Sequence, residues 1–156
     1  MQYNLGVQYD YEGRFCKAEL YYKDYDRLAL EETDADTKAV FLTSNGYGHS
    51  KGIDLFFRDR ASFKNLEYQL SYTYNIAKRK YREYLELTTP QYATRHNAAW
   101  VVKYSLPRLR SIVSVTDRFS SGRPYHNSML PGLMNDEVKP YNSLDLGVTF
   151  LASKKV

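Results

Sequence analysis

The stretch that decides the fold of this chain is Leu66-Glu67-Tyr68-Gln69-Leu70-Ser71-Tyr72-Thr73-Tyr74. Apolar and polar side chains alternate at every position, so the leucines and tyrosines share one face and the residues between them share the other. Successive side chains of a β-strand point to opposite sides of the sheet. This period of two therefore predicts a strand with one apolar face and one hydrated face.

The same alternation recurs along the whole chain. It predicts an all-β fold, an antiparallel up-and-down meander of about seven strands, in a single domain over residues 1–156. The sixth strand is the least regular, because Ile112 interrupts the face of Val113 and Val115. Residues 81–87 fit a short helical turn and an irregular loop equally well. The expected strands are residues 3–10, 14–25, 48–59, 65–77, 96–106, 109–120 and 142–153.

The expected connections are alternately short and long, and the long segments are residues 26–47, 78–95 and 123–141. Structureless loops longer than about 12–15 residues are uncommon in compact soluble domains. Outer-membrane barrels, by contrast, have short periplasmic turns and long extracellular loops. The chain also contains 16 tyrosines among 156 residues, and tyrosine suits a boundary between lipid and water. The pattern favours a segment of a transmembrane β-barrel, with its apolar face toward lipid.

Charge and composition exclude several other classes of protein. The net charge of +4 is spread along the chain, and no basic stripe or recognisable module predicts nucleic-acid binding. A single cysteine, Cys16, rules out a disulfide framework within the chain. No segment approaches the ~20 apolar residues of a membrane-spanning helix. Strand-like sequence follows Met1 at once, without a secretory signal, so we expect a cytoplasmic protein or a piece of a longer chain.

Residues with catalytic or metal-binding chemistry are present but are not arranged in a known pattern. No two of His49, His96 and His126 have the spacing of metal ligands. The acidic run at residues 31–36 lacks the spacing and the glycine of a calcium loop. Ser120-Ser121-Gly122 lacks the strand-to-helix context of a nucleophile elbow. We therefore expect no catalytic residues, no metal and no cofactor.

Four segments resemble a known family. Asn45–Leu55 contains Gly46-x-Gly48-x-x-x-Gly52 followed by an apolar residue and an acid, and it resembles a descending strand of TonB-dependent outer-membrane receptors. The other three segments resemble neighbouring strands and a loop rim of the same receptors, especially the Bacteroidota type, and they follow the family's order over nearly the whole chain. They are residues 18–25, residues 70–74 with 95–97, and residues 120–125.

The resemblance implies a 22-stranded barrel, a size that is plugged, in the outer membrane of a Gram-negative bacterium. Seven strands are then a late fragment of the barrel that lacks about two final strands, because the chain ends without the usual terminal aromatic residue and contains no plug or energy-coupling box. The implied function is uptake of a siderophore, a corrinoid or an oligosaccharide. The implied partners are the plug, the TonB complex, reached through the missing N-terminal region, outer-membrane lipid and the nutrient itself.

The aromatic and basic residues of the long loops are the expected ligand contacts, namely Tyr81, Tyr84, Tyr92, Arg123 and Tyr125. One alternative is a small soluble or periplasmic β-barrel that binds an apolar ligand, which needs the Tyr/Leu/Val face turned inward. A second alternative is an outer-membrane barrel enzyme that uses His96 and Ser121, although no residue pattern orients that pair.

Overall fold

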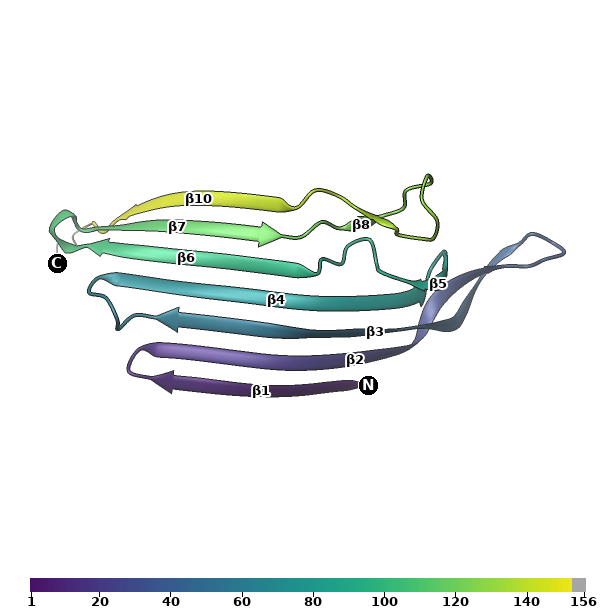
Figure 1. Cartoon of the computed structure of the whole chain (residues 1–156), viewed down its shortest axis with the longest axis horizontal. Helices are drawn as coiled ribbons and strands as arrows, with labels where there is room; N and C mark the ends of the chain where they lie inside the picture. The colour runs from purple at the N-terminus through teal and green to yellow at the C-terminus, as the bar shows by residue number, and fades with distance from the viewer. Residues whose placement is uncertain (153–156) are drawn as a thin grey trace.

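The computed structural model describes residues 1–152. Seven strands form one antiparallel sheet in the order β1-β2-β3-β4-β6-β7-β10, while β5 pairs with β4, and β8 pairs with β9 separately (Figure 1). The all-β meander expected from the sequence is confirmed. The strands are β1 (Gln2–Tyr11), β2 (Arg14–Thr33), β3 (Val40–Asp59), β4 (Leu66–Tyr81), β5 (Tyr84–Thr88), β6 (His96–Leu106), β7 (Ser111–Ser120), β8 (Pro124–Tyr125), β9 (Asp136–Glu137) and β10 (Tyr141–Phe150), with one 3₁₀ turn, η1 (Pro107–Leu109).

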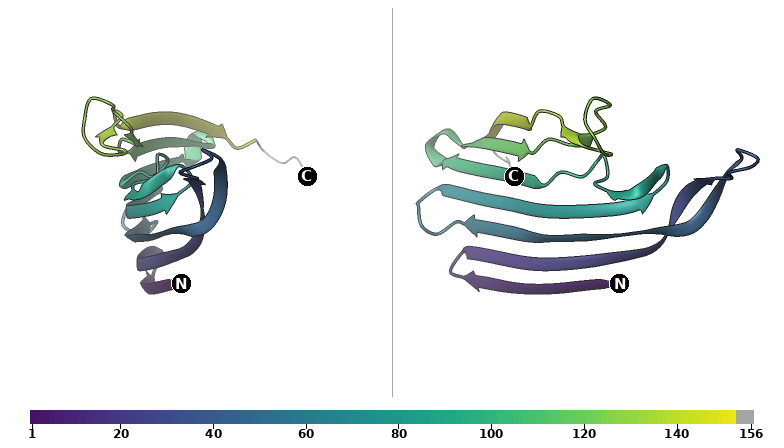
Figure 2. Two further views of the ribbon diagram at one scale, coloured as in Figure 1. Left: turned by 90° about the vertical axis from the view of Figure 1, so that its right-hand side faces the viewer. Right: turned by 45° about the vertical axis from the view of Figure 1, so that its right-hand side comes forward.

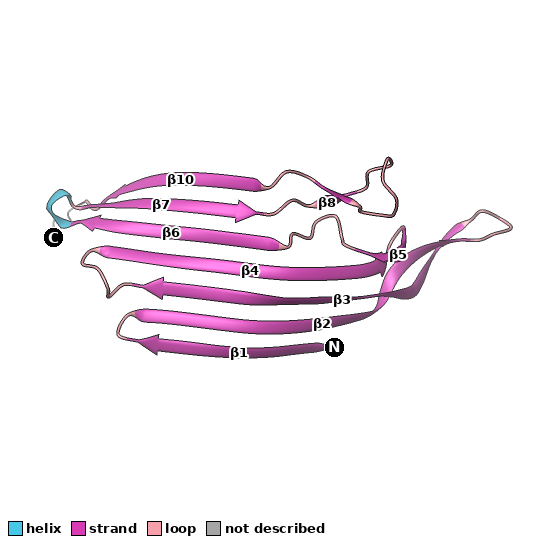
Figure 3. Cartoon of the chain, viewed as in Figure 1, coloured by secondary structure: helices cyan, strands magenta, loops and turns pink. Residues whose placement is uncertain are grey.

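The sheet is a single layer, and Figure 2 shows it from two further sides. Its only helical element among residues 1–152 is the short turn η1, coloured cyan in Figure 3. None of the described residues form a helix that is long and apolar enough to cross a membrane. The few fully enclosed side chains, such as Leu30 and Pro90, lie at the long-loop end rather than on the central part of the sheet.

The prediction of a long loop over residues 26–47 is wrong. β2 continues to Thr33 and β3 already begins at Val40, so the two strands form a long hairpin that extends beyond the rest of the sheet (Figure 1). Two irregularities in the pairing, on either side of Leu28, shift the register. Each shift changes the phase of the alternation, which is why the sequence pattern fades there although the strands continue.

Residues 81–87 form neither a helical turn nor an irregular loop. β4 runs to Tyr81, the chain reverses at Arg82 and Glu83, and β5 pairs back onto β4. Arg82 has a φ of 52°, the left-handed conformation that tight hairpin turns require. Ile112 does not break the alternation of β7, because it pairs with Ser105 and Thr149 on the polar face; the residue that interrupts the apolar face is Asp117, in register with Trp100 and Leu144.

Asp59 organises one of the short turns. One carboxylate oxygen accepts hydrogen bonds from the backbone N–H groups of Ala61 (2.8 Å) and Ser62 (2.9 Å). The other accepts from the Ser62 hydroxyl (2.6 Å) and the Tyr68 hydroxyl (3.1 Å), and Arg14 lies 3.5 Å away. These bonds, above all those from Ser62, hold the pKa of Asp59 well below its ordinary value. The ionised carboxylate therefore stabilises the turn.

Replacement of this carboxylate by an amide should destabilise the fold in a pH-dependent way. Because the pKa of Asp59 is depressed in the folded state, its contribution is complete above the unfolded pKa of about 3.9 and is lost as the pH falls below that value. We expect Asp59→Asn to lower the urea midpoint at neutral pH, and the difference from the wild type to shrink at pH ~3. An equal difference at both pH values would show that the charge of Asp59 contributes nothing.

Candidate functional site

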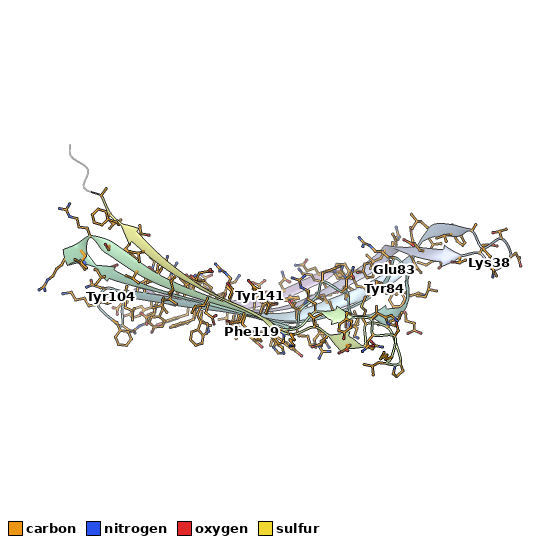
Figure 4. All side chains as sticks on the ribbon, turned by 90° about the horizontal axis from the view of Figure 1, so that it is seen from above. Lys38, Glu83, Tyr84, Tyr104, Phe119 and Tyr141 are labelled. Carbon is orange, nitrogen blue, oxygen red and sulfur yellow. The ribbon has the colours of Figure 1, made fainter. Side chains whose placement is uncertain are left out.

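One face of the sheet is apolar across all seven strands except at Asp117 of β7, whose carboxylate accepts a hydrogen bond from the Asn142 amide at 3.0 Å. Residues paired across antiparallel strands point to the same side, and the row formed by Leu20, Ile53 and Tyr74 crosses three strands in register. Tyr104 and Phe119, labelled in Figure 4, lie on this face too, whereas Tyr141 belongs to the other. We call the apolar residues of this face the apolar band. Its side chains are strongly exposed at the edge strand β10, where Leu146 is 77% exposed and Val148 is 74% exposed.

The apolar band crosses the rows of paired residues obliquely. On β2 the apolar band ends toward the long loops at Tyr22, because the next residue on that face is Asp24. On β10 the apolar band ends at Leu144, because the next residue on that face is Asn142. Pairing from strand to strand places Leu144 in the row of Cys16, six residues before Tyr22. A shift of six residues is about 20 Å along the strands, and five strand-to-strand steps are about 24 Å across them, so the band is inclined by roughly 40°.

The opposite edge of the apolar band moves by the same amount, from Cys16 on β2 to Phe150 on β10. A tilt of about 35–45° is typical of strands in outer-membrane barrels. Aromatic residues lie at both margins, as in the girdles of such barrels. Those toward the long loops are Tyr3, Tyr22, Tyr74 and Phe119, and those toward the short turns are Tyr9, Tyr68, Tyr104 and Phe150.

The other face of the sheet carries most of the charged and hydroxyl side chains, and several of them pair with one another. The Thr73 hydroxyl donates to Asp54 at 2.6 Å, and Lys17 lies 2.7 Å from Glu19. Arg118 pairs with Asp145. A wet, charged face opposite an apolar face is the arrangement of a barrel wall with a polar lumen.

Two glycines of β3 allow side chains from β2 to reach β4 across this polar face. Tyr21, Gly52 and Asn75 share one row, and the Tyr21 hydroxyl crosses Gly52 to donate to Asn75 at 3.0 Å. Ser50 donates to the same Asn75 oxygen at 2.8 Å. A Cβ atom on Gly52 would lie 2.5 Å from the Tyr21 hydroxyl and 2.2 Å from the backbone oxygen of Tyr74. Only glycine leaves room for this crossing.

The second crossing lies nearer the long loops and brings an arginine between two tyrosines. Tyr25, Gly48 and Arg79 share a row, and the guanidinium carbon of Arg79 lies 4.5 Å from the centre of the Tyr25 ring. Arg79 also donates from Nη1 to the Tyr92 hydroxyl at 2.7 Å. Its Nε is buried and makes no hydrogen bond within residues 1–152. This Tyr25–Arg79–Tyr92 group, the mouth cluster, combines a cation with two aromatic faces.

Tyr81 and Tyr84 lie beside the mouth cluster but are buried. Their ring centres are 5.7 Å apart, and the nearby Leu30 of the β2–β3 hairpin is fully enclosed. Backbone hydrogen bonds from Glu31 to Arg82 (2.8 Å) and from Arg82 to Ala29 (2.7 Å) join the hairpin to the β4–β5 turn. Burial, together with a hydrogen bond to Tyr92, raises the pKa of Tyr81 to about 12. These two tyrosines pack the loops together.

Arg123 and Tyr125 lie on a different loop, between β7 and β10. The Tyr125 hydroxyl donates to Asp136 at 2.6 Å, and the Asn127 amide donates to the same oxygen at 2.9 Å. The hydrogen bond to Asp136 raises the pKa of Tyr125 and lowers that of Asp136. The side chains of Arg123 and Tyr125 are exposed. Among the five residues expected from the sequence, the structure thus brings Tyr81, Tyr84 and Tyr92 together and leaves these two apart.

The histidines are separate from one another in their contacts. His96 shares a hydrogen bond of 2.8 Å with the Tyr72 hydroxyl, and His49 stacks on Tyr22 with ring centres 6.4 Å apart. Within the part of the chain that the structure describes, no three His, Cys, Asp or Glu side chains are placed to hold a metal ion.

A family model described as TonB dependent receptor-like, beta-barrel, matches residues 1–155. The chain belongs to the TonB-dependent receptor β-barrel family. Members of this family are outer-membrane transporters rather than enzymes, and their polar face lines the lumen. No match was found among curated proteins. Membership agrees with the inclined apolar band and supports a lumen-facing mouth cluster, against the alternative in which the apolar face encloses a ligand.

Sequence reasoning missed Tyr25 and Arg79, which the structure adds to the predicted Tyr92. A signal was present in the spacing of Gly46, Gly48 and Gly52. Glycines on a strand mark places where another group approaches the backbone closely. The identity of that group depends on the register of β2 and β4 against β3, which the spacing alone does not give.

Proposed function

We propose that this chain supplies barrel wall and outer loops to a longer outer-membrane receptor that imports a scarce nutrient. The nutrient would be a siderophore, a corrinoid or an oligosaccharide. Uptake would be driven by the TonB complex through a plug and an N-terminal region of the same receptor. The observation that carries this proposal is the apolar band, because its tilt of roughly 40° suits barrel strands that cross a bilayer.

The ligand contacts that we propose are five side chains at the long-loop end of the sheet, of which Tyr92, Arg123 and Tyr125 are exposed and Tyr25 and Arg79 are half-buried. Tyr25, Arg79 and Tyr92 face the lumen and combine a fixed cation with two rings, while Arg123 and Tyr125 contribute from the neighbouring loop. Arg79 lacks a carboxylate partner within residues 1–152, so its guanidinium is available for an oxygen of the ligand. The buried Tyr81 and Tyr84 would hold the mouth cluster in place by packing the loops beside it.

An uptake assay tests the proposal in cells that produce the full receptor as their only transporter of its kind. Labelled iron-loaded siderophores, corrinoids and oligosaccharides would be supplied in turn, with and without an active TonB complex. We expect one class to accumulate in a TonB-dependent manner. Accumulation of none of them above cells lacking the receptor, or accumulation that is independent of TonB, would contradict the proposed function.

Replacement of Arg79 by alanine should weaken this uptake. A hydrogen bond to a charged group contributes about 1.5–3 kcal/mol, so we expect the apparent affinity of Arg79→Ala to fall roughly 10- to 100-fold. Arg118→Ala serves as the matched control, because Arg118 is also on the polar face but already pairs with Asp145. If both variants lose affinity equally, Arg79 is no specific ligand contact.

A further inference from the structure

Three lysines lie directly beyond the apolar band at its long-loop margin and point to the same side of the sheet. Lys51 of β3 shares a row with Tyr22 and Ile76. Lys78 and Lys80 follow Ile76 at alternate positions of β4, in register with His49 and Tyr47. Because the side-chain period of a strand is two, all three occupy the face of the apolar band. We call Lys51, Lys78 and Lys80 the lysine patch.

The positive charges of the lysine patch are not neutralised within the described residues. No carboxylate of residues 1–152 lies within ion-pair distance of any of the three. Asp24, on the same face of β2, is in register with His49 and forms no ion pair with them. At the short-turn margin of the same face, by contrast, Arg14 lies 3.5 Å from Asp59.

The position of the lysine patch beside the apolar band places it next to the head groups of membrane lipids. The three lysine side chains leave the sheet beside apolar residues. Their methylene groups can therefore lie along the lipid tails while their ammonium groups reach the lipid head groups. Tyr22 and Tyr47 are next to it, and tyrosine rings prefer the head-group region. An ammonium group in that layer meets lipid phosphates, for which lysine is a common ligand.

We propose that the lysine patch binds the phosphate groups of lipids in the leaflet on the long-loop side of the membrane. This inference rests on the proposed function, since it is the barrel orientation that places the patch against the outer leaflet. Binding would fix the depth of β3 and β4 in the membrane, because the lysines are continuous with the apolar band on both strands.

A lipid titration tests the inference on the full receptor purified in detergent. The probes are bisphosphorylated lipid A and the same lipid after removal of its phosphates, with bound lipid counted by native mass spectrometry. We expect the wild type to retain the phosphorylated lipid and not the dephosphorylated one. In the K51Q/K78Q/K80Q variant, retention of the phosphorylated lipid should fall at least tenfold.

The control is K17Q/K23Q/K103Q, which removes the same number of charges from the polar face of the sheet. It should retain the lipid as the wild type does. The K51R/K78R/K80R variant preserves the charges and should also retain it, which separates loss of binding from loss of folding. Equal loss in both glutamine variants, unchanged binding in the first of them, or equal binding of both lipids would overturn the inference.

Failure of the proposed function has a different signature. A receptor that does not reach the outer membrane, or does not transport any probe, would contradict the function whatever the lipid result. A receptor that transports normally but shows no preference for phosphorylated lipid would contradict only the role of the lysine patch.

Discussion

Arginine in place of Leu70 should prevent most of the receptor from assembling in the outer membrane. Leu70 lies near the middle of the apolar band on β4, which extends from Leu66 to Ile76, and shares its row with Phe57 and Trp100. An arginine that faces lipid at the bilayer midplane costs about 2–4 kcal/mol. That cost is a large part of the stability of a typical folded protein, about 5–15 kcal/mol.

The measurement is the amount of folded receptor in outer-membrane fractions, read from its migration on gels with and without heating. Ser71→Arg is the control one residue away, on the polar face, where water and the ring of Phe56 in the same row can accommodate the charge. We expect Ser71→Arg to assemble close to the wild-type level. Equal losses at the two positions would mean that the apolar band does not face lipid.

Alanine in place of Gly52 should destabilise the barrel wall strongly. The new Cβ would lie 2.2 Å from the backbone oxygen of Tyr74 and would displace the Tyr21 ring. Tyr21 would then lose its hydrogen bond to Asn75. Overpacking of this kind typically costs about 1–3 kcal/mol, and a clash with backbone places Gly52→Ala at the upper end.

Urea unfolding of the purified receptor measures the effect. Gly6→Ala is the control, since a Cβ there would lie 3.5 Å from its nearest neighbour, the backbone oxygen of Ala18, at ordinary contact distance. Gly6 is also on the polar face, in register with Glu19. We expect a clear drop of the midpoint for Gly52→Ala and little change for Gly6→Ala. A Gly52→Ala midpoint equal to that of Gly6→Ala would refute the crossing as a stabilising feature.

The sequence predicted the sheet well where lipid and water impose a period of two on the strands. Outside the apolar band, lipid and water no longer impose this alternation on the side chains. The strands were therefore not predicted at residues 26–33 and 40–47, where register shifts also change the phase of the alternation. β5 was missed because its five residues, Tyr84–Thr88, are too short to distinguish strand from helical turn by pattern.

The mouth cluster was predictable only in part. Tyr92 could be proposed because it is an aromatic residue in a long loop. Tyr25 and Arg79 are separated by more than fifty positions in the sequence, and they meet only because Gly48 lies between them in one row. Strand register decides such contacts, and a single sequence gives the register of distant strands only indirectly.

The inclination of the apolar band has a consequence for the pore. A stagger of six residues over five strand-to-strand steps, continued through the 22 strands that the family resemblance implies for a whole barrel, would accumulate to a shear of about 26 residues. At ~4.8 Å between strands inclined by roughly 40°, the circumference becomes about 140 Å and the diameter roughly 44 Å between backbones. A bore of that width would exclude few nutrients by size, so the selectivity of the proposed receptor would have to come from a plug inside the barrel and from the loops above it.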